Sequence, residues 1–312
     1  MPTGSTSVTR SSSRTQRKQI QKAVSGKPRQ GRTSRRSRVP WDSYPHEKLW
    51  VSCVSEQAYC EKRVELWLKE PGDLVSVPRR LEQIDAGAIV QSRFASDGTK
   101  GHSELSADAL PVPAEVIQAQ LALGQSFWLA ESPFEGAFRG YPLAGVPDRI
   151  FFREGRAVSI VEYKFTDSNQ LQTSHRVQLL LYGYLLEECG IDVSELILIC
   201  ALIPRRHANE RLPDGIADQI RDASAQLVSR QRSLKNWRWL DMPVGNDISV
   251  NLRAFRYDRA RAESELEFFT QFWSGARPAI PTRMEKKCAR CLYNSMQCCS
   301  QALVRYGQDT GA

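Results

Sequence analysis

The chain has 312 residues, enough for one large domain or two modest ones. Hydrophobic residues make up 41% and charged residues 25%, a composition typical of globular proteins. No apolar run approaches the ~20 residues of a membrane-spanning helix, so we expect no membrane partner. The formal net charge of +8 is uneven along the chain.

Residues 1–40 form a basic, Ser-rich tail with 11 Lys and Arg and no acidic residue. With those removed from the total of 43, the rest of the chain has 32 basic side chains against 35 acidic ones. Three interpretations remain open: a disordered extension, an arm that grips nucleic acid, and an organelle transit peptide. Because the tail has no apolar signal core, we expect a cytoplasmic protein, or an organellar one in a eukaryote.

After the tail, periodicity predicts helices before the centre of the chain. They cover 49–69, 78–95 and 113–123, with a loop at 96–105 that contains Asp97, Gly98 and Gly101. The centre changes to short β-branched and aromatic runs, at 126–131, 140–152 and 156–165. The remaining elements are a helix at 171–188, a strand at 195–203, helices at 213–236 and 257–273, and a Cys-rich loop at 284–299. This order predicts an α/β core.

Two of the central runs carry the residues that indicate chemistry. Asp148 follows Gly145-Val-Pro, and Glu162 and Lys164 share one face of the next strand because side chains alternate along a strand. Glu154-Gly155 indicates a tight turn between the runs. A two-residue turn alone would place Val161 opposite Asp148, so pairing with Glu162 needs a longer loop or a β-bulge.

Two carboxylates that converge on one hairpin face make an oxygen-rich site suited to Mg²⁺ or Mn²⁺. Such an ion lowers the pKa of a bound water and stabilises the charge that builds up on a phosphodiester. An ammonium from Lys164 beside it would orient that water or neutralise the phosphate. A Glu and a Lys two residues apart on a strand are also common as a surface ion pair. The presence of Asp148 on the preceding strand, within reach across a hairpin, makes that alternative weaker.

The helix that follows adds polar residues to an otherwise apolar segment. His175, Gln178 and Tyr182 share one helix face, since they are separated by three and four residues. Leucines surround them on neighbouring positions. This pattern favours the edge of a site, although Gln and Tyr at an ordinary packing interface would look similar.

These motifs together resemble the RecB-like branch of the PD-(D/E)xK nuclease superfamily: Gly-Val-Pro-Asp148, Glu162-Tyr-Lys164, and Gln178 followed by Tyr182. The resemblance implies that Asp148, Glu162 and the backbone carbonyl of Tyr163 bind the metal, and that Lys164 assists the attacking water. It also implies that Gln178 and Tyr182 hold the site and the DNA strand.

Eight cysteines fall into a core pair and two terminal groups. Without a secretory signal, a disulfide framework is not expected. Cys189 and Cys200 lie in or beside apolar segments and fit ordinary core positions. The other six have the spacing of a metal loop with an upstream partner, for which structural zinc is one explanation: Cys53, Cys60, Cys288, Cys291, Cys298 and Cys299.

One cysteine before the nuclease core and a CxxC motif after it resemble the iron–sulfur RecB-like exonucleases, which include the CRISPR-associated Cas-four family and AddB-type nuclease domains. The resemblance covers about residues 49–299 and implies a 4Fe–4S cluster. It implies Cys60, Cys288, Cys291 and Cys298 as ligands, with Cys299 as the alternative to Cys298. Cys53 is the less favoured upstream ligand.

The chain departs from the family at one metal ligand. The family often has a histidine about four residues after a glycine in an N-terminal helix, whereas here Gly87 is followed at that distance by Gln91. An amide oxygen is a weaker ligand than imidazole for Mn²⁺. Gln91 could substitute, His102 could take its place, or the site could use fewer ligands.

The resemblance predicts a restriction-endonuclease-like α/β fold, a mixed central sheet flanked by helices with N-terminal helices and a Cys-rich loop closing the iron–sulfur site. The expected domains are a disordered tail (1–40), a nuclease domain (41–300, core about 126–204) and a C-terminal tail (301–312). The expected activity is an Mg²⁺- or Mn²⁺-dependent exonuclease on single-stranded or frayed DNA ends. It would serve CRISPR adaptation with integrase partners, or DNA repair. The alternative is a non-catalytic iron–sulfur DNA-binding scaffold.

Overall fold

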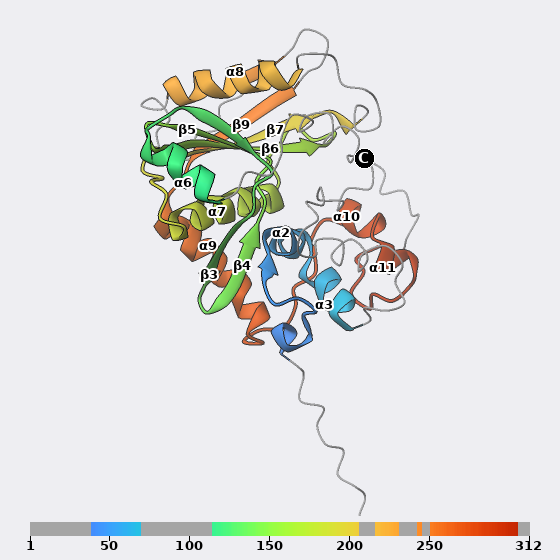
Figure 1. The fold of residues 1–312 in the computed structure, drawn as a ribbon. Helices are drawn as coiled ribbons and strands as arrows, with labels where there is room; N and C mark the ends of the chain where they lie inside the picture. The colour runs from blue at the N-terminus through green and yellow to red at the C-terminus, as the bar shows by residue number, and fades with distance from the viewer. Residues whose placement is uncertain (1–38, 70–113, 206–215, 231–241, 245–249, 305–312) are drawn as a thin grey trace, which may run out of the picture. The chain divides into compact units, whose positions relative to one another are not determined.

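The structure is a computed structural model that describes residues 39–69, 114–205, 216–230, 242–244 and 250–304 (Figure 1). The expected tail at 1–40, apart from its last two residues, the helix at 78–95, the loop at 96–105, Gln91 and His102 all lie outside these described residues. In the part of the chain that is described, no helix is both long enough and apolar enough to cross a membrane.

The strands form two mixed sheets. The larger sheet has the order β2 (Phe127–Ala130), β5 (Arg149–Arg153), β6 (Arg156–Phe165), β7 (Ile197–Ile203), β9 (Val250–Arg256) and β8 (Met242–Val244). Its β6 and β7 are parallel and its other neighbours are antiparallel. The smaller sheet has the order β1 (Leu49–Trp50), β4 (Tyr141–Gly145) and β3 (Phe134–Phe138).

Helices cover both faces of the larger sheet, which explains why β7 is buried at all seven positions. Alternate β7 residues enter two separate cores: Leu198, Cys200 and Leu202 lie in one, and their neighbours lie in the other. Helix α7 (Thr173–Glu188) belongs to the first core and α8 (Ile216–Ser229) to the second, on opposite faces of the sheet (Figure 1). The α/β fold class expected from the sequence is confirmed.

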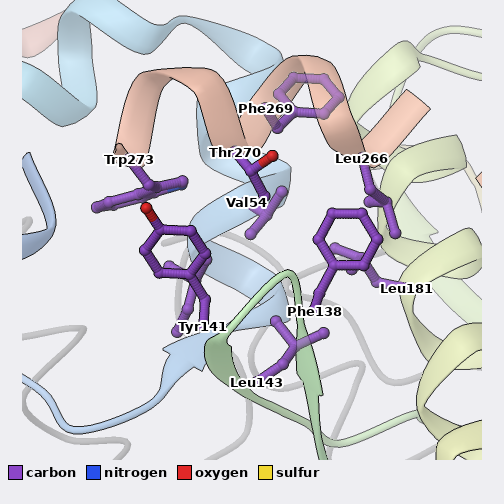
Figure 2. A pocket seen from close by; sticks show the side chains of 10 residues that line it. Val54, Phe138, Tyr141, Leu143, Leu181, Leu266, Phe269, Thr270 and Trp273 are labelled. Carbon is purple, nitrogen blue, oxygen red and sulfur yellow. The ribbon is translucent and has the colours of Figure 1, made fainter. Parts of the chain in front are cut away.

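The remaining helices frame the first core and the C-terminal segment. They are η1 (Pro40–Ser43), α2 (Val51–Tyr59), α3 (Glu61–Lys69), α6 (Ala114–Ala122), α9 (Arg259–Trp273), α10 (Glu285–Ala289) and α11 (Leu292–Ser295). Helix α2 packs against α7, and α9 packs against α7 and α2. Where α9, α2 and the β3–β4 hairpin meet, a small apolar cavity of about 10 Å³ remains between rings such as Phe138, Phe269 and Trp273 (Figure 2).

Several element boundaries differ from the sequence expectation. The run at 140–152 is two strands of different sheets, because the segment at Val146 and Pro147 leaves the ladder and Pro147 has no N–H to donate. The helix expected at 49–69 begins as β1 and is interrupted at Cys60, whose backbone is extended. Strands β3, β8 and β9 were not predicted. Strand β6 matches its expected range of 156–165.

Candidate active site

The β5–β6 hairpin sets the register of the acidic residues. Its turn has two residues, Glu154 and Gly155, both with positive φ, and Arg153 pairs with Arg156. A bulge then shifts the register, since Phe152 pairs with Ala157 while Phe151 pairs with Ser159. Beyond the bulge Arg149 pairs with Val161, so Asp148 comes opposite Glu162. The bulge, and not a longer loop, supplies the shift that this pairing requires.

Asp148 is buried and held by the neighbouring strand. Its Oδ2 accepts a hydrogen bond from the Tyr163 backbone N–H at 2.7 Å, and the residue is only 8% exposed. Burial raises the pKa of Asp148 to about 6, although the Lys164 ammonium and the Tyr163 N–H act in the opposite direction. A carboxylate held at this depth needs positive charge nearby to stay ionised at neutral pH.

Glu162 and Lys164 face α7 from the same side of β6. Lys164 Nζ donates to Glu162 Oε1 at 2.7 Å, and Glu162 is almost fully buried. Burial lowers the pKa of Lys164, but Glu162 and then Asp148 outweigh burial, so the net shift is upward. Lys164 therefore stays protonated beside both carboxylates.

Helix α7 fixes the position of Glu162. Gln178 Nε2 donates to Glu162 Oε1 at 2.6 Å and to the Tyr182 hydroxyl at 2.9 Å. Burial, Glu162 and Asp148 raise the pKa of Tyr182, so its phenol remains neutral. From α2, the Ser55 hydroxyl donates to the Ser174 carbonyl at 3.1 Å and lies 3.5 Å from Gln178 Oε1. Ser55 was not predicted, because nothing in the sequence relates α2 to α7.

The structure brings together the described residues predicted for the catalytic centre, through the contacts of Lys164 and Gln178 with Glu162 and of Gln178 with Tyr182. Tyr163 points its ring into the core on the α8 side, while its backbone N–H serves Asp148. In the described ranges, no three His, Cys, Asp or Glu side chains are placed to hold a metal ion together. Asp148 and Glu162 therefore offer a pair of carboxylate donors. Gln91, the further side-chain donor that was expected, lies outside the described residues.

A cavity of about 870 Å³ opens beside Lys164 and Gln178. Its walls come from α2, the end of β6 with the segment after it, the first two turns of α7, Arg205 after β7, and α10. His175 lines it together with serine and threonine hydroxyls and several cationic side chains. The predicted face of α7 that carries His175 and Gln178 therefore borders this space. The α10 contribution was not predicted, although its signal, Lys286-Lys-x-x-Arg290 around the first cysteine of the CxxC motif, stands in the sequence.

Four cysteine side chains line a second, smaller cavity of about 20 Å³: Cys60, Cys288, Cys291 and Cys299. Backbone N–H groups of Thr282 and Leu303 donate to the sulfurs of Cys60 and Cys288 at 3.4 and 3.2 Å. Burial raises the pKa of Cys299, with Cys291, Cys288 and Cys60 acting in the same direction.

Cys298, the ligand predicted from the resemblance, does not line this cavity. It is exposed, and its thiol donates to the Met296 carbonyl at 3.4 Å. Cys53 is buried in the apolar core instead. The structure therefore groups Cys299, and not the favoured Cys298, with the other three thiols. The spacing of the cysteines favoured Cys298, but the two residues are adjacent and their side chains take different directions.

A buried polar latch joins α3 to the segment that precedes these cysteines. The Arg277 guanidinium contacts both carboxylate oxygens of Glu61, and the Ile280 N–H donates to Glu61 Oε2 at 2.9 Å. Gln57 donates to Glu61 at 2.8 Å and accepts from the Trp273 indole at 2.7 Å. This latch, which was not predicted from the sequence, holds Cys60 and the cysteine loop close together.

Comparisons with known proteins identify the family. No curated protein matches the chain. A solved structure titled "Crystal structure of SSO0001" is similar to 92% of this chain and 95% of that one, with 14% sequence identity and a TM-score of 0.40. The family described as "PD-(D/E)XK nuclease superfamily" matches residues 61–299, a range that includes Asp148, Glu162 and Lys164. The chain therefore belongs to the PD-(D/E)XK nuclease superfamily.

Proposed function

We propose that this protein is a metal-dependent exonuclease that hydrolyses phosphodiester bonds at the ends of single-stranded DNA. The observation that carries the proposal is that Lys164 interacts with both Glu162 and Asp148 and also lines a large basic cavity. Each is held in place by a neighbour, so the arrangement is set before substrate arrives.

The donor set fits a hard divalent cation. Asp148 and Glu162 are both buried, and Lys164 is the ammonium whose pKa both carboxylates raise. Two buried carboxylates against one ammonium leave negative charge that Mg²⁺ or Mn²⁺ would compensate. Asp148, Glu162 and the Tyr163 carbonyl would hold the ion, with Gln91 as a further candidate. When bound, such an ion supplies Lewis acidity at the phosphate and lowers the pKa of a water molecule.

The chain's own residues would divide the remaining work. Lys164, protonated and 20% exposed at its side chain, reaches the cavity and places positive charge where the phosphate gains negative charge. Gln178 uses one amide nitrogen to hold both Glu162 and Tyr182, so it keeps the carboxylate in one orientation.

The form of the cavity supports a single strand as the substrate. Among the described residues, α2, α10 and the first two turns of α7 line it. Its walls combine hydroxyl groups with cations, the groups that bind a sugar–phosphate backbone without reading sequence.

The test of this function is a nuclease assay with purified protein, labelled single-stranded DNA and Mn²⁺. We expect Asp148→Asn and Lys164→Ala each to lower the cleavage rate at least ~100-fold, since each removes charge at the reacting phosphate. The matched control is Asp218→Asn, which removes an exposed carboxylate on α8, the helix on the other face of the sheet.

Linear and circular strands of the same sequence then separate the modes of attack. An exonuclease degrades the linear strand and spares the circle. Degradation at the same rate by wild type and both site variants would refute the catalytic assignment and favour a DNA-binding scaffold. Cleavage of circles would refute only the exonuclease mode.

We further propose a 4Fe–4S cluster held by Cys60, Cys288, Cys291 and Cys299, in place of Cys298. Its support is the shared cavity and the backbone N–H groups directed at two of the sulfurs. Cluster binding would require these thiols to move closer together, since no three of the described cysteines are placed to hold a metal ion in this structure. Anaerobically purified protein should contain iron and sulfide and absorb visible light. Cys299→Ser should lose both, while Cys298→Ser, its adjacent control, should keep them. Zinc in place of iron, or the reverse pattern between the two variants, would contradict the proposal.

The proposed cellular role rests on the resemblance to the Cas-four family. We propose end trimming of DNA during CRISPR adaptation, with integrase proteins as partners, and DNA repair as the alternative setting. Binding of the purified protein to an integrase complex, measured by co-elution, would favour the first. Failure to co-elute, with intact nuclease activity, would favour the second.

A further inference from the structure

The short helix α10 faces two cavities. Cys288 lies on α10 and lines the cysteine cavity, whereas Lys286 lines the large cavity beside Lys164, as does Arg290 directly after the helix. Lys287 lines both, and its ammonium lies 4.1 Å from the centre of the Tyr59 ring, which also lines both. The segment that carries the cysteines is therefore also a wall of the substrate cavity.

The side chains that line the large cavity carry a strong excess of positive charge. Among the described residues that line the large cavity, five are Lys or Arg and two, Glu56 and Asp167, are acidic. Glu56 is already paired with Arg63 at 2.9 Å. Lys286 and Arg290 are exposed and form no ion pair with the described carboxylates. Lys286 and Arg290, which pair with no described carboxylate and line the same cavity, are suited to an anionic ligand.

His175 links this wall to the catalytic residues. It is on α7, one turn before Gln178, and its Nδ1 is buried without a hydrogen-bond partner among the described residues. Burial, followed by the charges of Lys164 and Lys287, lowers the pKa of His175 to about 3. The imidazole is therefore neutral and lies within the field of both ammonium groups, one from the catalytic side and one from α10.

We propose that His175, Lys286, Lys287 and Arg290 form a phosphate subsite that holds the nucleic-acid strand one or more nucleotides away from the scissile bond. The subsite rests on the proposed nuclease function and extends it. The ligand is a phosphate of a single strand, either an internal phosphodiester or a terminal phosphate. Because Cys288 lies between Lys287 and Arg290, the grouping of the cysteines sets the position of the subsite.

The test measures binding of fluorescent single-stranded oligonucleotides by anisotropy in EDTA, so that cleavage does not interfere. The double variant Lys286→Ala, Arg290→Ala should bind at least ~10-fold more weakly at low salt. The slope of log affinity against log salt should fall by about 1.4, since each phosphate that the protein no longer neutralises lowers it by about 0.7. Arg283→Ala is the matched control, since Arg283 is exposed in the same segment but does not line the cavity.

His175→Ala should weaken binding without changing the salt slope, since a neutral imidazole releases no counterion.

Oligonucleotides with a 5′-phosphate and with a 5′-hydroxyl distinguish the two sources of phosphate. If the double variant loses affinity equally for both, the ligand is an internal phosphodiester. If it loses affinity only for the phosphorylated strand, the ligand is a terminal phosphate. Both results support the subsite.

Unchanged affinity and slope in the double variant, equal to Arg283→Ala, would overturn the subsite. This outcome is distinguishable from failure of the proposed function. If wild type cleaves DNA but the double variant binds normally, only the subsite is wrong. If wild type never cleaves but the double variant loses affinity, only the nuclease function is wrong.

Discussion

At the scale of single residues, the site depends on buried charges that are costly without a ligand. Asp148 is the clearest example, because burial raises its pKa to about 6 in the metal-free protein. Its ordinary pKa in an unfolded chain is about 3.9. The folded state therefore binds this proton more tightly than the unfolded state, and stability is lost as the pH rises from about 4 to about 6.

Asp148→Asn should therefore stabilise the metal-free protein at neutral pH while it abolishes activity. The gain should not exceed about 3 kcal/mol, since each unit of pKa corresponds to about 1.4 kcal/mol. Urea unfolding in EDTA at pH 5 and pH 8 measures it, and the gain should be larger at pH 8. Added Mn²⁺ should raise the stability of wild type more than that of the variant. A variant that is less stable than wild type at pH 8 would show that burial of this carboxylate carries no cost.

Gly145 shows how closely backbone and site are packed. A Cβ atom there would lie 2.7 Å from Val51 Cγ2 and 2.8 Å from Tyr182 Cε1. Gly145→Ala should therefore cost about 1–3 kcal/mol through overpacking and displace Tyr182 from Gln178. The cleavage rate and the free energy of unfolding in urea should both fall. Gly136→Ala is the milder control, because its nearest neighbours are side-chain atoms at 3.1 and 3.2 Å. Equal effects of the two changes would argue against a role for the Tyr182 position.

At the scale of elements, the latch between α3 and the segment after α9 stabilises the cysteine region. Glu61 is 3% exposed, and its carboxylate is satisfied by Arg277, Gln57 and a backbone N–H. Removal of the guanidinium would leave a buried carboxylate without its cation, which costs more than the pair itself contributes.

Arg277→Ala should thus lower the free energy of unfolding by about 3–5 kcal/mol in a urea titration. Arg139→Ala removes an ion pair with Glu267 whose side chains are 55% and 50% exposed, and it should cost less than about 1 kcal/mol. A similar small cost for both changes would mean that solvent reaches Glu61 more freely than its burial indicates.

At the scale of the whole molecule, the α/β core and the placement of Asp148, Glu162 and Lys164 on one hairpin could be predicted from the sequence because their signals are local. Side chains alternate along β6, so Glu162 and Lys164 lie on the same face. Helix α7 is rich in leucine, so its few polar residues stand out in the sequence. The placement of Cys299, Ser55 and the latch could not be predicted, because each depends on contacts between segments more than 100 residues apart. Strand β3 is short and contains Gly136, so its pattern was too weak.

The bulge in β6 limits which insertions and deletions the β5–β6 hairpin can accept. Because the turn has two residues, the bulge alone shifts the register so that Asp148 lies opposite Glu162. A deletion that straightens β6 would turn Glu162 and Lys164 away from α7, however conservative it looks in composition. An insertion of one residue in the turn could compensate, so the lengths of the turn and of the strand must change together or not at all.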